Sequence, residues 1–404
     1  MSDTVDGKIA GQEAAASRLR DEFAELRIVD VQALTFRYPS RVGVDEEGHA
    51  HPAPEHEALK TVTRVRTSAG VDGYCFGGSA ETAAVATRLI RGMNPLDREA
   101  IWYRLLRVQR LERRTLADHN LAAVDGALWD FAGRLVGLPV HMLLGGARDR
   151  VPAYASTMCG DDIPGGLDSP AAYADFAQAC KERGYTAFKM HGWMPPYGAD
   201  VARDIAACRA VRERVGPEMR LMLDAHHDYS RQEALTLGRA LEELGFYWFE
   251  EPMNEHSTSS YVWLTEQLDI PIVGPETAAG QMFTRAEWIV RGAADISRVG
   301  VFDLGGITPA MKAVHLCQAF GVRAEVHGTG AANLHVLGAM ATLGEYYERG
   351  LLHPHLDYEA QTPWLAEPID PLVADGCVPI PRRPGLGEAI DWDFIRDHAV
   401  TPWQ

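Results

Sequence analysis

The fold of this chain is decided by three short apolar runs that each end in a carboxylate: LMLDAHH (221–227), YWFEEP (247–252) and IPIVGPE (270–276). The carboxylates are Asp224, Glu250 and Glu276, and each follows the one before by 26 residues (250 − 224 and 276 − 250). One β/α repeat of a barrel takes about 25–30 residues. The equal spacing therefore predicts three neighbouring parallel strands whose carboxylates meet at one rim of a barrel.

The same alternation of short apolar strands and amphipathic helices extends in both directions. Five further runs fit it: VPAYAS (151–156), TAFKMH (186–191), DISRVGV (295–301), RAEVHG (323–328) and LLHPHLDY (351–358). Alternating strands and helices are typical of parallel β/α units. We predict eight strands that close into a barrel over residues 149–362.

The first third of the chain has a different pattern. RIVDVQALTFRY (27–38) and TVTRVRT (61–67) read as antiparallel strands, and the polar segment 39–57 between them reads as a long lid loop. Helical patterns follow, and the turn-rich end from about residue 363 is expected to pack against this part. We predict an α+β capping domain of residues 25–148 plus about 363–404, preceded by an extension at 1–24.

Composition limits the possible partners. The chain has 404 residues, with 39 basic and 56 acidic side chains and a net charge of −17, which disfavours a nucleic acid partner. No signal peptide and no stretch long enough to span a bilayer is evident, so we expect a cytoplasmic protein. Six cysteines lack metal-like spacing and are expected to be buried free thiols.

The carboxylate trio predicts a metal site. Acidic residues at strand ends can simply cap the next helix, but three in register form a set of hard oxygen ligands, which suits Mg²⁺ better than zinc. Strand alternation allows only one member of the Glu250–Glu251 pair to point inward. We predict Asp224, Glu250 and Glu276 as Mg²⁺ ligands.

At this point the chain resembles the enolase superfamily, and within it the mandelate racemase subgroup. The resemblance rests on these metal motifs together with AAVDGALWDFAGRLVGLPVHMLLGG (122–146), LGGIT (304–308) and PGLGEAID (384–391). It implies a modified (β/α)₇β barrel under an α+β cap. It also implies a Mg²⁺ ion that stabilises the enediolate formed when a proton next to a carboxylate is removed.

Candidate proton-transfer residues lie on neighbouring strands. Lys189 and His191 are two residues apart and so face the same side; the resemblance implies a Lys-x-Lys pair here, with His191 replacing the second lysine. His226 follows Asp224 by two and resembles the Asp-x-His arrangement of acid-sugar dehydratases. His227 should point away. Lys189 has the alternative role of binding the substrate carboxylate.

His327, at the end of the seventh strand, matches the histidine that serves as a base in the family. Its usual partner is an aspartate five residues before the first glycine of GGIT, and Gly300 holds that place in this chain. Asp303 is close enough to substitute, but we expect it to cap a loop or helix instead. The missing carboxylate argues against racemisation, which needs a competent base on both faces of the substrate.

Substrate-binding candidates are spread over the lid and the last strand. Arg37, Tyr38 and His51 lie in or beside the predicted lid, where His49 and His56 also lie and where solvated surface histidines are an equally good reading. Asp357, on the predicted eighth strand, is near the place of a substrate-contacting acidic residue in the family. Cys75 is expected to serve packing.

These features predict a Mg²⁺-dependent lyase that dehydrates an acid sugar of the aldonate type to a 2-keto-3-deoxy acid. One histidine, His191 or His226, would take the α-proton, and His327 or the other histidine would protonate the departing hydroxide. A racemase or epimerase is the alternative enzyme, and a non-catalytic ligand-binding relative is the alternative class. We expect a small carboxylate as partner and a homo-oligomer.

Overall fold

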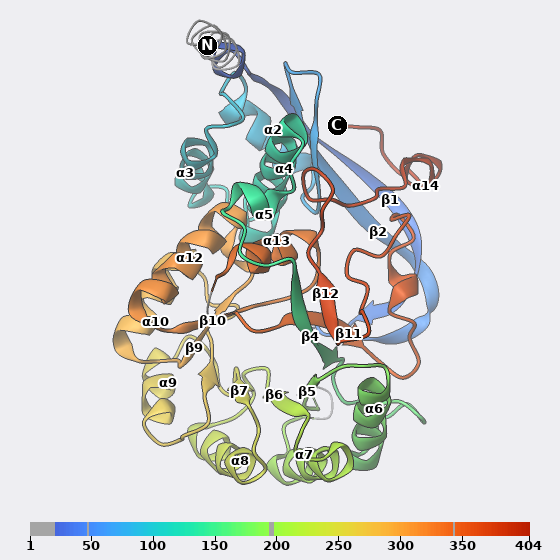
Figure 1. The fold of residues 1–404 in the computed structure, drawn as a ribbon, viewed down its shortest axis with the longest axis vertical. Helices are drawn as coiled ribbons and strands as arrows, with labels where there is room; N and C mark the ends of the chain where they lie inside the picture. Colours follow the sequence, from blue (N-terminus) through green and yellow to red (C-terminus); the bar gives the residue numbers. More distant parts are fainter. Residues whose placement is uncertain (1–20, 47, 194–197, 342–343) are drawn as a thin grey trace, which may run out of the picture.

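The computed structural model describes residues 21–46, 48–193, 198–341 and 344–404, and Figure 1 shows their arrangement. The predicted extension at 1–24 lies outside this part of the chain except for residues 21–24, which are helical. No helix among the described residues combines the length and apolarity needed to cross a membrane. All six cysteines are free, and five of them are buried.

The cap contains a three-stranded antiparallel sheet in the order β1-β2-β3. Its strands are β1 (Ile28–Val44), β2 (Ala50–Thr67) and β3 (Gly73–Phe76). The prediction of a long lid loop at 39–57 is wrong, because β1 and β2 continue as a hairpin arm in which Val44 pairs with Ala50. A register shift between Ser40 and Val42 interrupts the pairing, and it lets the arm bend without losing its ladder.

Four helices follow along the cap: α2 (Ala80–Ile90), α3 (Arg98–Gln109), α4 (Asp118–Val136) and α5 (Val140–Leu143). Helices α2 and α4 pack on the sheet, and α3 and α5 pack against α4. Helix α4 is buried continuously from Asn120 to Gly133, as expected for a helix that is apolar on several faces. It lies so close to β3 that a Cβ on Gly73 would be 1.9 Å from the Ala127 carbonyl oxygen. Glycine at position 73 therefore permits the close contact between this strand and the helix.

The second sheet has nine strands and carries the predicted parallel β/α units. Its main path is β10-β9-β8-β7-β6-β5-β4-β11, and the strands are β4 (Arg150–Thr157), β5 (Ala187–His191), β6 (Arg220–Asp224), β7 (Trp248–Glu250), β8 (Ile272–Val273), β9 (Ile296–Val299), β10 (Arg323–Val326) and β11 (Tyr347–Leu352). The eighth strand therefore begins four residues earlier than the predicted run at 351–358.

Helices cover the outside of this curled sheet (Figure 1). They are α6 (Pro170–Glu182), α7 (Val201–Val215), α8 (Arg231–Glu243), α9 (Thr258–Thr265), α10 (Gln281–Arg291), α11 (Val301–Leu304), α12 (Ile307–Phe320) and α13 (Ala331–Ala339). Complete ladder closure was predicted, but no backbone ladder joins β10 to β11 in the described chain. The Glu325 carboxylate bridges this seam by accepting hydrogen bonds from the amides of Glu345 and Tyr346.

The C-terminal segment returns to the cap, as the sequence predicted. It contains η1 (Glu359–Gln361), β12 (Cys377–Pro379) and α14 (Trp392–Asp397). Strand β12 pairs with β4 of the barrel, whereas Ala33 and Gln404 exchange backbone hydrogen bonds of 2.8 and 3.0 Å at β1. The segment thus fastens the cap sheet to the barrel (Figure 1).

The LGGIT motif (304–308) makes a second connection between the barrel and the cap. Its Thr308 donates through both its amide (2.9 Å) and its hydroxyl (2.6 Å) to the buried Asp125 carboxylate of α4. A Cβ on Gly306 would be 2.4 Å from Asp125. The glycine is therefore what allows the barrel turn to approach the cap helix.

Candidate active site

The three predicted metal ligands lie at the carboxyl ends of consecutive barrel strands. Asp224 ends β6 and Glu250 ends β7, and the two residues are direct partners in the parallel ladder. Glu276 follows β8 by three residues. All three lie at the end of the barrel where the functional residues of this architecture gather.

Lys189 forms ion pairs with two of these carboxylates, Asp224 and Glu250. Its ammonium nitrogen lies 2.9 Å from Asp224 Oδ2, 3.2 Å from Glu250 Oε2 and 3.0 Å from Glu348 Oε1, and the side chain is 1% exposed. These carboxylates raise the pKa of Lys189 well above its usual range, against the opposing effect of burial. In this arrangement Lys189 is a fixed positive charge.

Arg298 of β9 is a second buried cation that pairs with these carboxylates. Its Nε lies 2.6 Å from Glu250 Oε1 and 3.3 Å from Glu276 Oε2, and its Nη2 lies 2.7 Å from Glu348 Oε2. Arg298 is fully buried. Arg298 and Glu348 were not predicted from the sequence, although alternation along their strands places both on the inward face.

The carboxylate cluster fits a hard divalent cation. Glu250 Oε1 is paired with Arg298 Nε at 2.6 Å without the alignment of a hydrogen bond, so this buried oxygen retains capacity for a cation. Burial raises the pKa of Glu276 to about 8, and this effect outweighs His327 and Arg298. A dication among these oxygens would interact with Glu250 Oε1 and would favour the ionised form of Glu276.

His191 and His226 face each other beside Asp224. Their ring centroids are 4.7 Å apart, and His191 Nε2 lies 3.2 Å from Asp224 Oδ2. One potential ligand atom from each of these three residues lies within 4.8 Å of the other two. Burial lowers the pKa of His226 well below its usual range, although Asp224 acts in the opposite direction. Burial therefore favours the neutral form of the His226 imidazole.

The tip of the β1–β2 hairpin reaches this pair. The ring of His49 meets the ring of His226 edge-on at a centroid distance of 5.0 Å. Asp45 Oδ2 lies 3.3 Å from His49 Nδ1 and 3.0 Å from His51 Nε2. The hairpin tip thus lies against His226, and His51 lies there as a partner of Asp45.

His327 lies on the Glu276 side of the cluster. Its Nε2 is 3.1 Å from Glu276 Oε1, and its Nδ1 is 2.6 Å from Asp303 Oδ2. The expectation that Asp303 caps a loop or helix is wrong, since its carboxylate contacts the imidazole instead. Burial acts to lower the pKa of His327, but Glu276 and Asp303 outweigh it and raise the pKa to about 10.

Three predicted substrate-binding residues have other contacts. Arg37 is half-exposed and pairs with Glu57 at 3.5 Å, and the Tyr38 ring packs edge-on against Trp364. Asp357 lies beyond the end of β11, is exposed, and accepts a hydrogen bond from the Glu359 amide. The structure does not bring these three side chains into the histidine and carboxylate cluster.

Glu251 and His227 contact each other beside the trio, and both have left-handed backbone (φ 44° and 65°), so strand alternation does not set the direction of their side chains. Glu251 is 2% exposed and its Oε2 lies 3.4 Å from His227 Nε2. Glu255 lies beside them and accepts hydrogen bonds from the amides of Glu276, Thr277 and Ala278. Glu255 thereby holds the backbone of the loop that carries Glu276.

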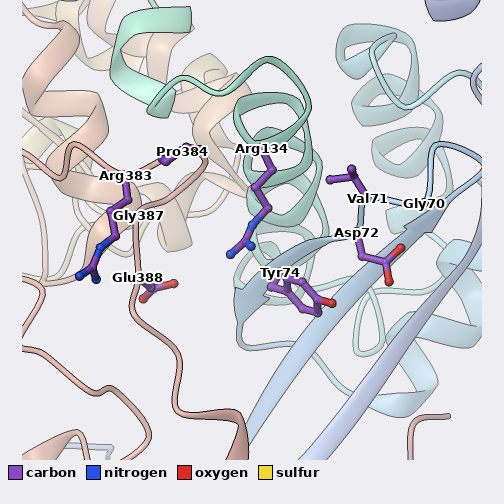
Figure 2. Close-up of a pocket in the computed structure, with 9 residues that line it drawn as sticks. All are labelled: Gly70, Val71, Asp72, Tyr74, Arg134, Arg383, Pro384, Gly387 and Glu388. Carbon is purple, nitrogen blue, oxygen red and sulfur yellow. The ribbon is translucent and has the colours of Figure 1, made fainter.

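A separate cavity of about 510 Å³ opens in the cap, between β3, the end of α4 and the C-terminal segment (Figure 2). Figure 2 shows Tyr74 and Arg134 on one side of it and Arg383 and Glu388 on the other. Its lining contains none of the predicted site residues. The chemistry is therefore assigned to the barrel rim, where the titratable groups converge, rather than to this cavity.

Comparisons with known proteins agree with this geometry. The family of enolase C-terminal domain-like proteins matches residues 172–394, and the mandelate racemase / muconate lactonizing enzyme N-terminal domain matches residues 50–145. D-galactarolactone cycloisomerase of Agrobacterium fabrum is 33% identical over 80% of this chain and 86% of its own length. Arabinonate dehydratase of Saccharolobus solfataricus is 31% identical over 83% and 89%.

Among solved structures, D-glucarate dehydratase from Agrobacterium tumefaciens, complexed with magnesium, superposes with a TM-score of 0.90. It is 50% identical, with 93% of this chain and 99% of that chain covered. The agreement extends over the cap and the barrel together. This chain therefore belongs to the mandelate racemase / muconate lactonizing enzyme family of the enolase superfamily.

Proposed function

We propose that this protein is a magnesium-dependent carbon–oxygen lyase that dehydrates an acid sugar to a 2-keto-3-deoxy acid. The observation that carries the proposal is the set of three carboxylates, Asp224, Glu250 and Glu276, gathered on consecutive strand ends by the buried cations Lys189 and Arg298. Relatives that act on arabinonate and glucarate support the substrate class.

The three carboxylates would hold Mg²⁺, with positions left open for substrate oxygens. Bound there, the ion would stabilise the negative charge that develops on the substrate carboxylate when the neighbouring proton leaves. Lys189 and Arg298 keep the carboxylates ionised and oriented. Lys189 also remains our candidate for contact with the substrate carboxylate.

Two groups of histidines divide the proton transfers. His191 or His226, on the Asp224 side, takes the α-proton, and the electron pair left behind forms the enediolate. The enediolate then expels the hydroxyl of the next carbon, and His327, on the Glu276 side, gives that hydroxyl a proton so that it leaves as water. The resulting enol becomes the 2-keto acid. His327 is suited to this role because Glu276 and Asp303 both contact its imidazole and raise its pKa, which favours the protonated form.

A second enzyme function gains support from one contact. The sequence argued against a racemase or epimerase because His327 lacked its usual carboxylate, but Asp303 supplies one at 2.6 Å. Histidines on two sides of the site would also suit proton removal from one face and return to the other. Deuterium exchange at the α-carbon without loss of water would identify this activity.

The test is turnover of an acid-sugar library containing aldonates and aldarates, with Mg²⁺ present and 2-keto acids measured. We expect 2-keto-3-deoxy acid from at least one substrate, loss of product with EDTA, and loss of product in Glu250→Gln. Glu243→Gln, an exposed glutamate of α8, is the matched control and should keep full activity. No turnover across the library, together with activity on an amino-acid derivative, would overturn the proposal.

Three further features belong to the same proposal. We place the protein in the cytoplasm and expect it to form a homo-oligomer, and we divide the chain into an extension (1–24), a cap (25–148 with about 363–404) and a barrel (149–362). The hydrogen bonds between Ala33 and Gln404 support the assignment of the chain's end to the cap.

A further inference from the structure

From the geometry around His327 we infer that Gly300 and Asp303 form a coupled pair. In this pair, the missing side chain at 300 admits the Asp303 carboxylate, which orients His327. Asp303 is then a positioning residue that acts through His327. The kinetic part of this inference rests on the function proposed above, whereas its structural part does not.

The glycine at 300 is required for space and not for backbone conformation. Gly300 has φ −102° and ψ 137°, an extended conformation that any residue adopts. A Cβ at this position, however, would be 1.7 Å from Asp303 Oδ2 and 3.2 Å from His327 Cβ. A side chain at 300 would therefore displace the Asp303 carboxylate oxygen that contacts His327.

The turn between these residues places the carboxylate. Residues 301–304 form a single helical turn, α11, in which the Leu304 amide donates to the Gly300 carbonyl at 3.0 Å. The turn brings Asp303 back over Gly300, which is why a carboxylate three positions later reaches the space left by the missing side chain.

A buried amide fixes this turn relative to His327. Asn333 is 2% exposed; its Oδ1 accepts from the Val301 amide at 3.1 Å, and its Nδ2 donates to the His327 carbonyl at 2.7 Å. The Asn333 side chain thereby holds both the turn that carries Asp303 and the backbone of His327. The contact is a property of the packed structure and not of a freely rotating surface aspartate.

The imidazole is left with a defined orientation. Asp303 occupies Nδ1, so Nε2 is the nitrogen that faces Glu276 at 3.1 Å and the space among the carboxylates. A carboxylate that holds one ring nitrogen fixes which nitrogen is presented for proton transfer. The contact between Asp303 and the imidazole thus has a direct chemical consequence at the opposite side of the ring.

The inference is tested with Gly300→Ala, Asp303→Ala and the double variant, in crystal structures and in kinetics. In Gly300→Ala we expect the Asp303 carboxylate to move out of hydrogen-bond range of His327 Nδ1. Each single variant should lower kcat about 10- to 100-fold, as loss of an orienting partner typically does, while KM stays within about twofold. The double variant should be no worse than Asp303→Ala, because both changes remove the same contact.

Gly192→Ala is the matched control. Gly192 follows β5, four strands from β9 in the sheet, and an added Cβ would meet its nearest atom, Asp204 Oδ2, at an ordinary 3.5 Å; full activity is expected. An intact Asp303–His327 bond in the Gly300→Ala crystal, or losses that multiply in the double variant, would overturn the inference. Because the crystal structure needs no substrate, the Asp303–His327 contact is tested even if the proposed function fails.

Discussion

At the scale of single residues, the site is a balance of buried charges. Asp224, Glu250 and Glu348 surround Lys189, and burial alone would make each of these ions unfavourable. The carboxylates and the cations are stable only together. Lys189 and His191 hold the pKa of Asp224 well below its usual range, against the opposing effect of burial.

Replacing Lys189 with methionine leaves three carboxylates without their shared cation. We expect Lys189→Met to lower the free energy of unfolding by about 3–5 kcal/mol in EDTA, since breaking one partner of a buried ion pair has costs of this size. Mg²⁺ should reduce the loss, because a dication among the same oxygens replaces part of the missing charge. Denaturant unfolding with and without Mg²⁺ measures both values, and a loss that is equal in the two conditions would contradict the account.

The two groups of histidines should separate the two halves of the reaction. If His226 takes the α-proton, His226→Asn should lose both deuterium exchange and water loss, by about 100-fold or more. His327→Asn should keep exchange at the α-carbon in D₂O but lose 2-keto acid formation. Proton NMR of the recovered substrate and the keto-acid assay distinguish these results. Equal loss of exchange in both variants would instead make His327 a second base and favour the racemase alternative.

At the scale of elements, the sequence predicted the barrel strands that carry the carboxylates but not the hairpin β1–β2. The strand ends that carry Asp224 and Glu250 were predictable, because equal spacing and apolar patterning survive in any β/α barrel. The segment 39–57 was predicted as a loop because its proline, glycine and charge content masks the cross-strand pairing that forms the arm. Arg298 and Glu348 were missed because a charge in an apolar strand becomes interpretable only when its buried partners are known.

The turn of the hairpin should control substrate binding more than catalysis. Asp45→Ala removes the shared partner of the His49 amide and of the His49 and His51 rings. Three lost hydrogen bonds of about 0.5–1.5 kcal/mol each predict a rise in KM of about tenfold or more, with a smaller change in kcat. Leu59→Thr, at an exposed position of β2 (62% exposed), is the control and should leave KM unchanged. Steady-state kinetics measure both. An unchanged KM in Asp45→Ala would mean that the hairpin tip does not touch the substrate.

At the scale of the whole molecule, cap and barrel are fastened by buried polar contacts. His335 of α13 accepts a hydrogen bond from the His141 amide at Nδ1 (3.1 Å), and its Nε2 lies 3.1 Å from the Leu386 carbonyl of the C-terminal segment. The imidazole is completely buried. Burial lowers its pKa from the ordinary 6.5 to about 3, so the folded protein keeps it neutral.

This histidine should make the protein sensitive to acid. Above pH 6.5 His335 is neutral in both states; below it, the unfolded chain binds a proton that the folded chain refuses until about pH 3. Stability is therefore lost as the pH falls, by about 2 kcal/mol between pH 6.5 and pH 5. His335→Gln, which cannot titrate, should show a smaller drop in Tm over this range. Parallel pH dependence of Tm in the two proteins would contradict the assignment.

We propose that Asp224, Glu250 and Glu276 together hold one hard divalent cation. The most direct measurement is calorimetric titration of metal-free protein with Mg²⁺, for the wild type and for Asp224→Asn, Glu250→Gln and Glu276→Gln. The account predicts one ion per chain in the wild type and a loss of binding in each of the three variants, with Glu243→Gln unchanged. Wild-type binding that persists at full affinity in all three variants would show that the ion, and the chemistry assigned to it, belong elsewhere.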